Sequence, residues 1–322
     1  MRELLDPLKF VQGAVARKDF VPELRYFRLE GGVAQAFNGM MAISAPIDLD
    51  LRCAPRAEAM VRALAHCEDT VGLSLVDNGR LLVTSGKFRS FVPCVSPEDY
   101  PDISPAGQYL EVDGEGLLRG LRTVEGFIGN DATRPWANGV LLRGASAFAT
   151  NNVTLVQYWL GETLPFEANV PAPAVREVLR VGVAPCAVQL DESCMTFHYE
   201  DGRWIRTQLF STEWPPVEKI LERDPGGLAP VPDDLFPGLA TLKPFLDRSA
   251  HVYFEDGYMG TLNTDQDGTA YDVPGLPAGG LYLHSMLSLL EPVATHIDFG
   301  SYPEPCLFVG DRLRGVIMGL RR

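Results

Sequence analysis

The chain has 322 residues, which is enough for two or three domains of ordinary size. Hydrophobic residues make up 46% of it, as in packed globular proteins. The net charge of −14 argues against a generic nucleic-acid binder with a uniformly basic surface. The six cysteines are scattered and form no CxxC motif, which favours reduced thiols in a cytosolic protein over a zinc site. No apolar run is long enough to form a signal-peptide core or a membrane span, so we expect a cytoplasmic location and no membrane partner.

The first third of the chain reads as a helix, strands, a second helix and a three-stranded meander. Apolar stripes predict helices over residues 4–18 and 55–67, with Pro55 in the first turn of the second. Residues 71–103 alternate apolar and other side chains at period two, which is typical of half-buried strands. Asn78-Gly79 is the expected turn of the first hairpin in this meander.

The second third repeats this order, and a connector rich in proline and glycine follows it. The expected elements are a strand, a helix, paired strands, a short helix and a second meander, at residues 109–113, 114–126, 134–162, 173–181 and 186–210. The connector covers residues 214–232 and reads as a domain boundary.

The last third shows the same order again. Asp233-Asp234 precedes a predicted helix that runs to residue 248 and that Pro237 and Pro244 shorten or kink. Strands are expected over residues 251–273, a helix over 281–294 and the third meander over 296–320.

The three meanders recur at nearly constant spacing. They begin at residues 71, 186 and 296, so that the intervals are 115 and 110 residues. A repeat of this length is domain-sized. The sequence therefore predicts three copies of one α+β domain, over residues 1–107, 108–222 and 223–322.

The predicted helices are less acidic than the rest of the chain. Six helical windows contain eleven basic and nine acidic residues, a net charge of +2, so the remainder carries −16. Helices collected on one surface would hold a polyanion by phosphate contacts without reading its sequence. Arginines that only increase solubility are the alternative interpretation. The basic residues are Lys9, Arg17, Lys18, Arg56, Arg62, Arg119, Arg122, Arg176, Arg180, Lys243 and Arg248.

Five segments carry the motifs of one protein family in the order of that family. They are SGKFRSFVPCVSPEDYPDI, RPWANGVLL, AFATNNVTLVQ, NVPAPAVREVL and the C-terminal RGVIMGLRR. Through these motifs and their order, the chain resembles the bacterial β sliding clamp of DNA polymerase III over essentially its whole length. The chain is short for that family, which suggests a phage or mobile-element origin.

The resemblance implies a processivity factor without catalytic residues, metal or cofactor. It implies a homodimeric, head-to-tail ring around double-stranded DNA, with helices lining the lumen and antiparallel sheets outside. The eleven basic residues would then face DNA, and the partners would be a DNA polymerase and a clamp loader. A clamp-fold decoy that binds replication or repair enzymes without encircling DNA is the alternative, and an unrelated α+β enzyme is a third reading for which the sequence offers no site.

The resemblance also implies a pocket for partner peptides between the second and third domains. Its residues here are Thr150, Asn152, Val153, Thr154, Leu155, Val316, Ile317, Met318, Gly319, Leu320 and Arg321. The family's Asp-Gly-His-Arg turn reads Asn151 to Thr154 in this chain, and Gly319 stands where the family has proline. Ordinary interdomain core is the alternative role of these apolar positions. Residues 263–268 partly match a calcium loop, but the pattern favours a turn between strands.

Overall fold

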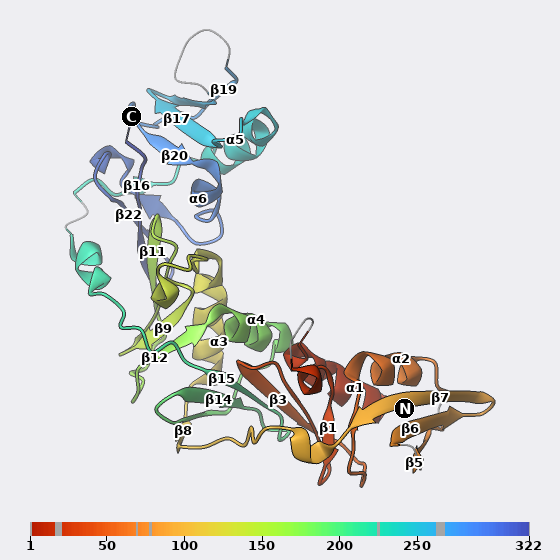
Figure 1. The fold of residues 1–322 in the computed structure, drawn as a ribbon. Coiled ribbons are helices and arrows are strands. Elements are labelled where there is room, and N and C mark those ends of the chain that lie inside the picture. Colours follow the sequence, from red (N-terminus) through yellow and green to blue (C-terminus); the bar gives the residue numbers. More distant parts are fainter. Residues whose placement is uncertain are drawn as a thin grey trace. The chain divides into compact units, whose positions relative to one another are not determined.

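A threefold repeat of one element order organises the chain (Figure 1). The computed structural model describes residues 2–16, 21–68, 70–76, 79–223, 226–261 and 268–321. Each repeat contains a helix, a first set of three strands, a short strand that leads into a second helix, and a second set of three strands. Repeats two and three also begin with an additional short strand. This order confirms the predicted α+β fold with three repeats.

Within its described residues the first repeat contains two α-helices and seven strands. The elements are α1 (Arg2–Val11), β1 (Arg28–Glu30), β2 (Val33–Phe37), β3 (Met41–Pro46), β4 (Ala54–Pro55), α2 (Ala57–Ala65), β5 (Gly72–Val76), β6 (Arg80–Ser85) and β7 (Phe88–Val95). Short 3-10 helices are η1 (Gln12–Ala14), η2 (Pro22–Arg25) and η3 (Pro97–Asp99).

The second and third repeats follow the same plan. The second contains β8 (Gln108–Glu111), α3 (Gly114–Val124), β9 (Gly139–Arg143), β10 (Ser146–Thr150), β11 (Thr154–Trp159), β12 (Ala168–Pro171), α4 (Ala172–Val181), β13 (Ala187–Leu190), β14 (Cys194–His198) and β15 (Trp204–Gln208). The third contains β16 (Ala229–Pro230), α5 (Leu235–Leu242), β17 (His251–Glu255), β18 (Tyr258–Gly260), β19 (Ala270–Asp272), β20 (Leu281–Leu283), α6 (His284–Ser288), β21 (His296–Ile297), β22 (Cys306–Gly310) and β23 (Leu313–Ile317). Further 3-10 helices are η4 (Glu125–Phe127), η5 (Pro135–Ala137), η6 (Val217–Glu222), η7 (Lys243–Phe245) and η8 (Phe299–Ser301).

Antiparallel sheets join strands of successive repeats. A seven-stranded sheet has the order β1-β2-β3-β15-β14-β13-β8, and an eight-stranded sheet has the order β12-β9-β10-β11-β23-β22-β21-β16. Two four-stranded sheets, β4-β7-β6-β5 and β19-β18-β17-β20, contain strands of a single repeat each. The chain divides into two compact units, residues 1–118 with 173–209 and residues 119–172 with 210–322. The three domain boundaries drawn from the sequence stay a prediction.

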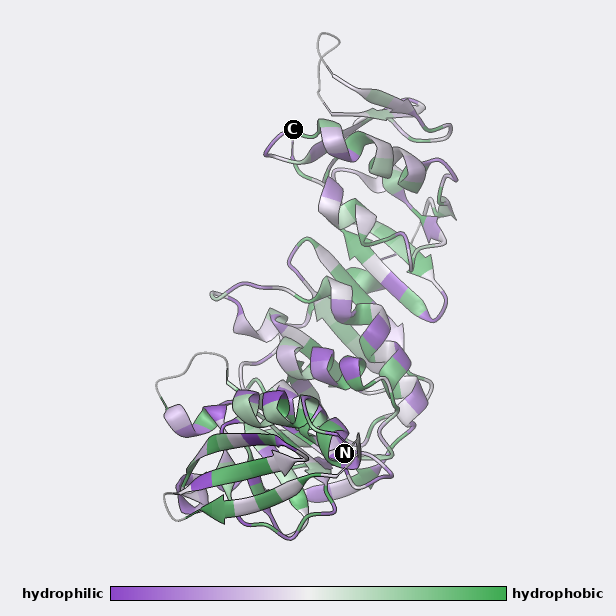
Figure 2. Ribbon diagram, turned by 90° about the vertical axis from the view of Figure 1, so that its right-hand side faces the viewer, coloured by the Kyte–Doolittle hydropathy of each residue, from purple (hydrophilic) through white to green (hydrophobic). Residues whose placement is uncertain are grey.

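Hydrophobic side chains build the interior of each unit, and hydrophobic residues are frequent in the strands in Figure 2. In the first unit, Leu8 of α1, Phe27 and Ile43 of β3 are fully buried. In the second unit, Phe254 and Tyr282 are fully buried, with their ring centroids 4.9 Å apart. The helices are amphipathic and bury only one face, so their opposite faces are free to carry charge. No helix within the described ranges is both long and apolar enough to cross a membrane.

The first predicted helix is shorter than expected. It was predicted over residues 4–18, whereas α1 ends at Val11 and η1 follows. Close packing explains the end, because a Cβ atom on Gly13 would lie 2.0 Å from Oε1 of the buried Glu177. Glycine leaves room for the Glu177 carboxylate here, and glycine also weakens a helix.

Two further helix predictions were wrong at their first residues. Pro55 lies in β4, where it pairs with Cys94 of β7, and not in the first turn of α2. Residues 281–283 form β20, which pairs with β17, and only the short α6 follows. Leu281 and its neighbours suit a buried strand as well as a helix, and the available edge of β17 decides between them. The strand expected to run to residue 320 ends at Ile317.

Two turns predicted from the sequence lie partly outside the described residues. In the Asn78-Gly79 turn, Asn78 lies outside the described residues, although β5 and β6 pair on either side of the turn as expected. The partial calcium-loop match at residues 263–268 is the other, because 263–267 lie outside the described ranges.

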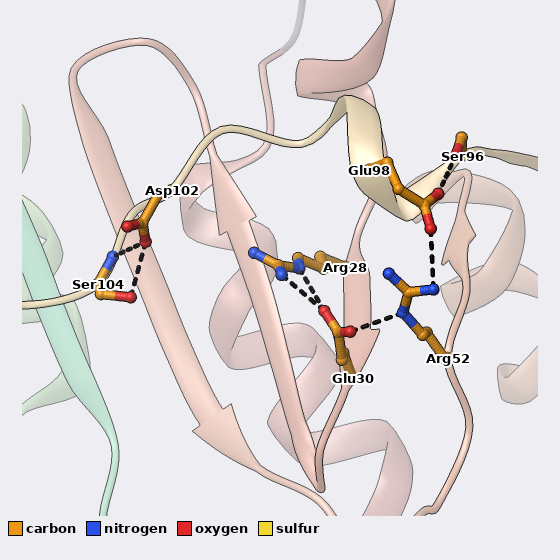
Figure 3. Close-up of polar contacts among 7 residues, drawn as sticks. All are labelled: Arg28, Glu30, Arg52, Ser96, Glu98, Asp102 and Ser104. Atoms are coloured by element: carbon orange, nitrogen blue, oxygen red, sulfur yellow. Dashed lines mark hydrogen bonds and ion pairs between the residues drawn. The ribbon is translucent and has the colours of Figure 1, made fainter.

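Charged side chains fasten the segment that follows the first meander to β1 (Figure 3). Arg28 donates two hydrogen bonds to Oε2 of Glu30, at 2.9 and 2.6 Å, and Nε of Arg52 donates to Oε1 at 2.6 Å. Arg52 also pairs with Glu98 of η3 at 2.8 Å. The hydrogen bonds from Arg52 and then Arg28 lower the pKa of Glu30. Arg52 and Glu98 are exposed and Arg28 and Glu30 are half-buried, so each pair adds little stability, but the chain of pairs fixes where η3 lies against β1.

Candidate functional site

The two segments of the predicted peptide pocket lie side by side in the eight-stranded sheet. β11 pairs with β23 antiparallel, with Thr154 opposite Ile317 and Leu155 opposite Val316. The ladder continues past the end of β23, because the backbone N–H of Met318 donates to the carbonyl of Val153 at 2.8 Å. Segments about 160 residues apart in sequence therefore meet.

The turn between β10 and β11 depends on two asparagines. Oδ1 of Asn151 accepts hydrogen bonds from the backbone N–H groups of Val153 and Thr154, at 3.1 and 2.8 Å, and from the Thr154 hydroxyl at 2.9 Å. Asn152 adopts a left-handed conformation with φ of 69°. Asparagine tolerates this conformation better than most residues, so it can replace the glycine of the clamp motif without changing the turn.

The C-terminal segment is held against its own unit. The N–H of Leu320 donates to the carbonyl of Leu281 at 2.7 Å, and the Tyr302 hydroxyl donates to the carbonyl of Leu320 at 2.6 Å. A Cβ atom on Gly319 would lie 2.5 Å from the Tyr302 ring. The ring leaves no room for the proline found in the clamp motif, and this explains the glycine here.

The predicted pocket residues divide into a buried row and an accessible group. Thr150, Thr154, Leu155, Val316 and Ile317 are each at most 5% exposed. The accessible group contains Met318, which is 41% exposed, together with Asn152, Val153, Gly319, Leu320 and Arg321. Any partner must therefore contact the accessible group, while the buried row sets its position. Peptide binding at these residues stays a prediction.

The sequence analysis missed the contribution of the connector to this region. Trp214 and Leu221 of the connector are 4% and 3% exposed, and they pack in one cluster with Leu155 and Val316. Nη1 of Arg314 in β23 donates to the carbonyl of Leu221 at 3.2 Å, which fixes η6 against the sheet. The cluster contains Leu141, Phe148, Leu155, Trp214, Leu221, Leu307 and Val316, with Trp136 and Val217 at its border.

A signal for this role was present in the sequence. Large apolar residues in a connector are expected to pack against another surface of the protein, because leaving apolar side chains exposed to water costs free energy. Ile220 of η6 remains 38% exposed and offers a further apolar contact near the cluster.

The basic residues predicted to face DNA are mostly on helix surfaces. Arg17 and Lys18 lie outside the described residues. Arg56 precedes α2 and is half-buried. The other eight are exposed, on or beside α1 to α5: Lys9, Arg62, Arg119, Arg122, Arg176, Arg180, Lys243 and Arg248.

Arg62 and Arg180 have carboxylate partners of their own. Arg62 pairs with Glu58 on the next turn of α2. Arg180 pairs with Glu177 at 2.5 Å and also donates to the carbonyl of Phe10 at 3.1 Å. Their charge is therefore less available to an external anion than that of unpaired neighbours. The role of all these residues in DNA binding stays a prediction.

Comparison with known proteins gives agreement in fold over the whole chain. No family model and no curated protein matches the sequence. The β sliding clamp of Caulobacter crescentus superimposes with a TM-score of 0.87 at 20% identity, covering 99% of this chain and 97% of the other. DNA polymerase III subunit beta from Pseudomonas aeruginosa gives 0.85 at 18% identity, with 100% and 98% coverage. The DNA polymerase sliding clamp from Bacillus subtilis gives 0.86 at 12% identity, with 99% and 97% coverage. The chain therefore has the fold of the bacterial DNA polymerase sliding clamps.

Proposed function

We propose that this protein is a sliding clamp that closes a homodimeric ring around duplex DNA and tethers a DNA polymerase. The main support is the way in which strands of successive repeats pair. The same pairing occurs twice within the chain, and the two strands that would make it a third time do not pair with each other. A tether of this kind acts by raising the local concentration of the polymerase at its template, so it requires no chemistry on the clamp itself.

Both junctions within the chain are built in the same way. The third strand of one repeat pairs with the last strand of the next repeat, β3 with β15 and β11 with β23. The corresponding strands left over are β19 of the third repeat and β7 of the first. Within the described residues β19 is an edge strand, and β4 covers only positions 94 and 95 on the outer side of β7. A second copy in head-to-tail orientation would supply both missing partners and remove the exposed edges.

The third repeat can be aligned with the second through its first hairpin. β17–β18 and β9–β10 both turn through two residues, so Tyr258 corresponds to Ser146. Asp272 pairs with Tyr258, and Trp159 pairs with Ser146. Asp272 therefore corresponds to Trp159, the last residue of β11.

The first repeat can be aligned with the third in the same manner. β6–β7 and β22–β23 both turn through two residues, so Phe88 corresponds to Leu313 and Lys87 to Arg312. The N–H of Trp159 donates to the carbonyl of Arg312 at 2.8 Å, and the Arg312 guanidinium lies 5.1 Å from the Trp159 ring centroid. We apply the same register to the pairing of β19 with β7 of a second copy. Asp272 then lies beside Lys87 of that copy.

The chemistry of the two edges is complementary. The β6–β7 hairpin exposes Lys87 and Arg89, whereas Asp256 and Asp272 are exposed on the β17–β19 sheet. Phe91 on β7 is 50% exposed, and an interface at this edge would cover it. Opposite charges beside exposed apolar side chains are typical of a protein interface.

The basic helix surfaces support DNA as the ligand of the ring. Cations such as Arg119 and Arg122 contact phosphates without reading bases, and the acidic remainder of the chain disfavours binding elsewhere. Met318, Val153 and Leu320 are the accessible side chains for peptides of the polymerase and of a clamp loader, with Ile220 as an addition.

Solution mass and topology together test this proposal. Light scattering over a dilution series should give twice the protomer mass of 35.3 kDa. The protein assembled on a nicked circular DNA should stay bound through gel filtration and should be released when the circle is cut. A monomer at every concentration, or equal retention on circular and linear DNA, would refute the ring.

A further inference from the structure

A cavity in the first unit is lined by two arginines that the ring proposal does not use as a pair. Its volume is about 340 Å³, within the range of about 300–1,000 Å³ that is usual for small-molecule sites. It lies where α2 begins and where η1 and η2 end. The lining residues are Gln12, Val15, Ala16, Arg25, Arg56 and Glu58.

Backbone hydrogen bonds fix the walls of this cavity. The N–H of Ala16 donates to the carbonyl of Leu24 at 2.9 Å, which joins the end of η1 to η2. The N–H of Arg56 donates to the carbonyl of Pro93 in β7 at 2.8 Å, which ties the start of α2 to the sheet. Arg25 and Arg56 therefore reach one cavity from two separately anchored elements, and the site does not depend on either helix alone.

The cavity has an excess of positive charge. Arg25 and Arg56 are half-buried, and neither makes an ion pair or a side-chain hydrogen bond with a residue in the described ranges. Glu58 is the one carboxylate among the described lining residues, and it pairs with Arg62 on its own helix. Among the described residues no side chain caps the N-terminus of the nine-residue α2, so its first N–H groups add positive potential on the same side.

We propose that this cavity binds one phosphate group through the guanidinium groups of Arg25 and Arg56, with the Gln12 amide as a further donor. Arginine presents two parallel N–H donors that match phosphate oxygens, and half-burial strengthens such hydrogen bonds by excluding water. Two guanidiniums from different elements hold an anion at a defined place, unlike the separate exposed cations on the helix surfaces.

A backbone phosphate of duplex DNA is the expected source of this group. That part of the inference rests on the proposed function, whereas binding of a phosphate group does not. The DNA backbone would then have one preferred contact point in the first repeat of each protomer, in addition to the non-specific electrostatic attraction of the basic helices.

Two variants and two probes test the site. Arg25→Gln and Arg56→Gln each remove one guanidinium and keep an amide donor. Arg134→Gln removes an exposed arginine of the second unit and serves as the matched control, and Arg25→Lys keeps the charge without the paired donors. Inorganic phosphate is titrated by calorimetry, a short duplex by fluorescence anisotropy over a salt series, and circular dichroism checks that each variant is folded.

We expect both glutamine variants to weaken phosphate binding at least tenfold and Arg134→Gln to leave it unchanged. Arg25→Lys should fall between the wild type and Arg25→Gln. Each glutamine variant should also reduce the slope of log affinity for duplex against log salt by about 0.9, the contribution of one phosphate contact.

The outcomes separate the site from the ring. Unchanged phosphate affinity in both folded glutamine variants would overturn the site. Lost phosphate binding with an unchanged salt slope would support the site and exclude DNA as its ligand. A wild type that binds phosphate but no short duplex would exclude DNA as the ligand of the site and leave the phosphate site standing, and the ring is then judged by retention on circular DNA alone.

Discussion

Reversal of a single charge at the proposed ring closure tests its geometry directly. The register carried over from β11–β23 sets Lys87 of one copy beside Asp272 of the next. Lys87→Glu converts an attraction into a repulsion. An exposed pair contributes about 0.2–1 kcal/mol, so reversing its sign changes each interface by roughly 0.4–2 kcal/mol.

Ring closure doubles this effect. A head-to-tail dimer has two equivalent interfaces, and both must open for the protomers to separate. The free energy of dissociation therefore falls by about 0.8–4 kcal/mol, which weakens the dimer from roughly fourfold to several hundredfold. The effect should shrink at high salt, because both side chains are exposed.

Mass photometry over a dilution series measures the dimer dissociation constant. Lys87→Glu and Asp272→Lys should each weaken the dimer, and the double variant should recover most of the loss. Lys243→Glu makes the same charge change beside α5 and should leave the dimer unaltered. If the single variants dissociate like the wild type, or if the double variant is weaker than both, the register is wrong.

Three other predictions concern the peptide site, the β10–β11 turn and the charged network. Joint replacement of Met318 and Leu320 by alanine should weaken a polymerase peptide by about 1–2 kcal/mol per side chain in anisotropy titrations and leave the ring intact. Asn152→Val should lower the free energy of unfolding by about 1–2 kcal/mol in urea, because φ is 69° there. The lowered pKa of Glu30 means that its pairing stabilises the fold above the unfolded-state pKa, and this stability is lost as pH falls through the folded-state pKa. Arg52→Gln should move the pKa of Glu30 back up in a carboxyl NMR titration.

Each of these has a control that can contradict it. Unchanged peptide affinity in the Met318/Leu320 variant would remove these residues from the partner site. Asn152→Gly should be nearly neutral, and equal losses for glycine and valine would show that the left-handed conformation is not the cause. A pKa of Glu30 that does not respond to Arg52→Gln would mean that Arg52 is not its main partner.

Local chemistry explains which parts of the fold were predictable. The meanders were found because alternating apolar residues and turn residues specify a hairpin within ten to twenty residues. Repetition of these hairpins then indicated three domains. The helices were less predictable at their ends, since the packing of Gly13 against Glu177 and the pairing of residues 281–283 with β17 involve residues far away in sequence.

The candidate site was predictable in part. Thr150 to Leu155 and Val316 to Arg321 were identified through their resemblance to clamp motifs, and their pairing in one sheet agrees with that prediction. Trp214 and Leu221 were not identified, because their role depends on a surface formed by strands far away in sequence. The cavity between Arg25 and Arg56 was missed for the same reason.

By itself, the sequence determined the α+β class, the threefold order of elements and the concentration of basic residues on helices. These follow from periodicity, turn residues and composition, which act over a few residues at a time. Only the tertiary structure decided which strands join the repeats, which pocket residues stay accessible and which arginines converge on one cavity. Such choices depend on contacts between residues more than a hundred positions apart, such as Leu155 with Val316, and no local pattern encodes that pairing.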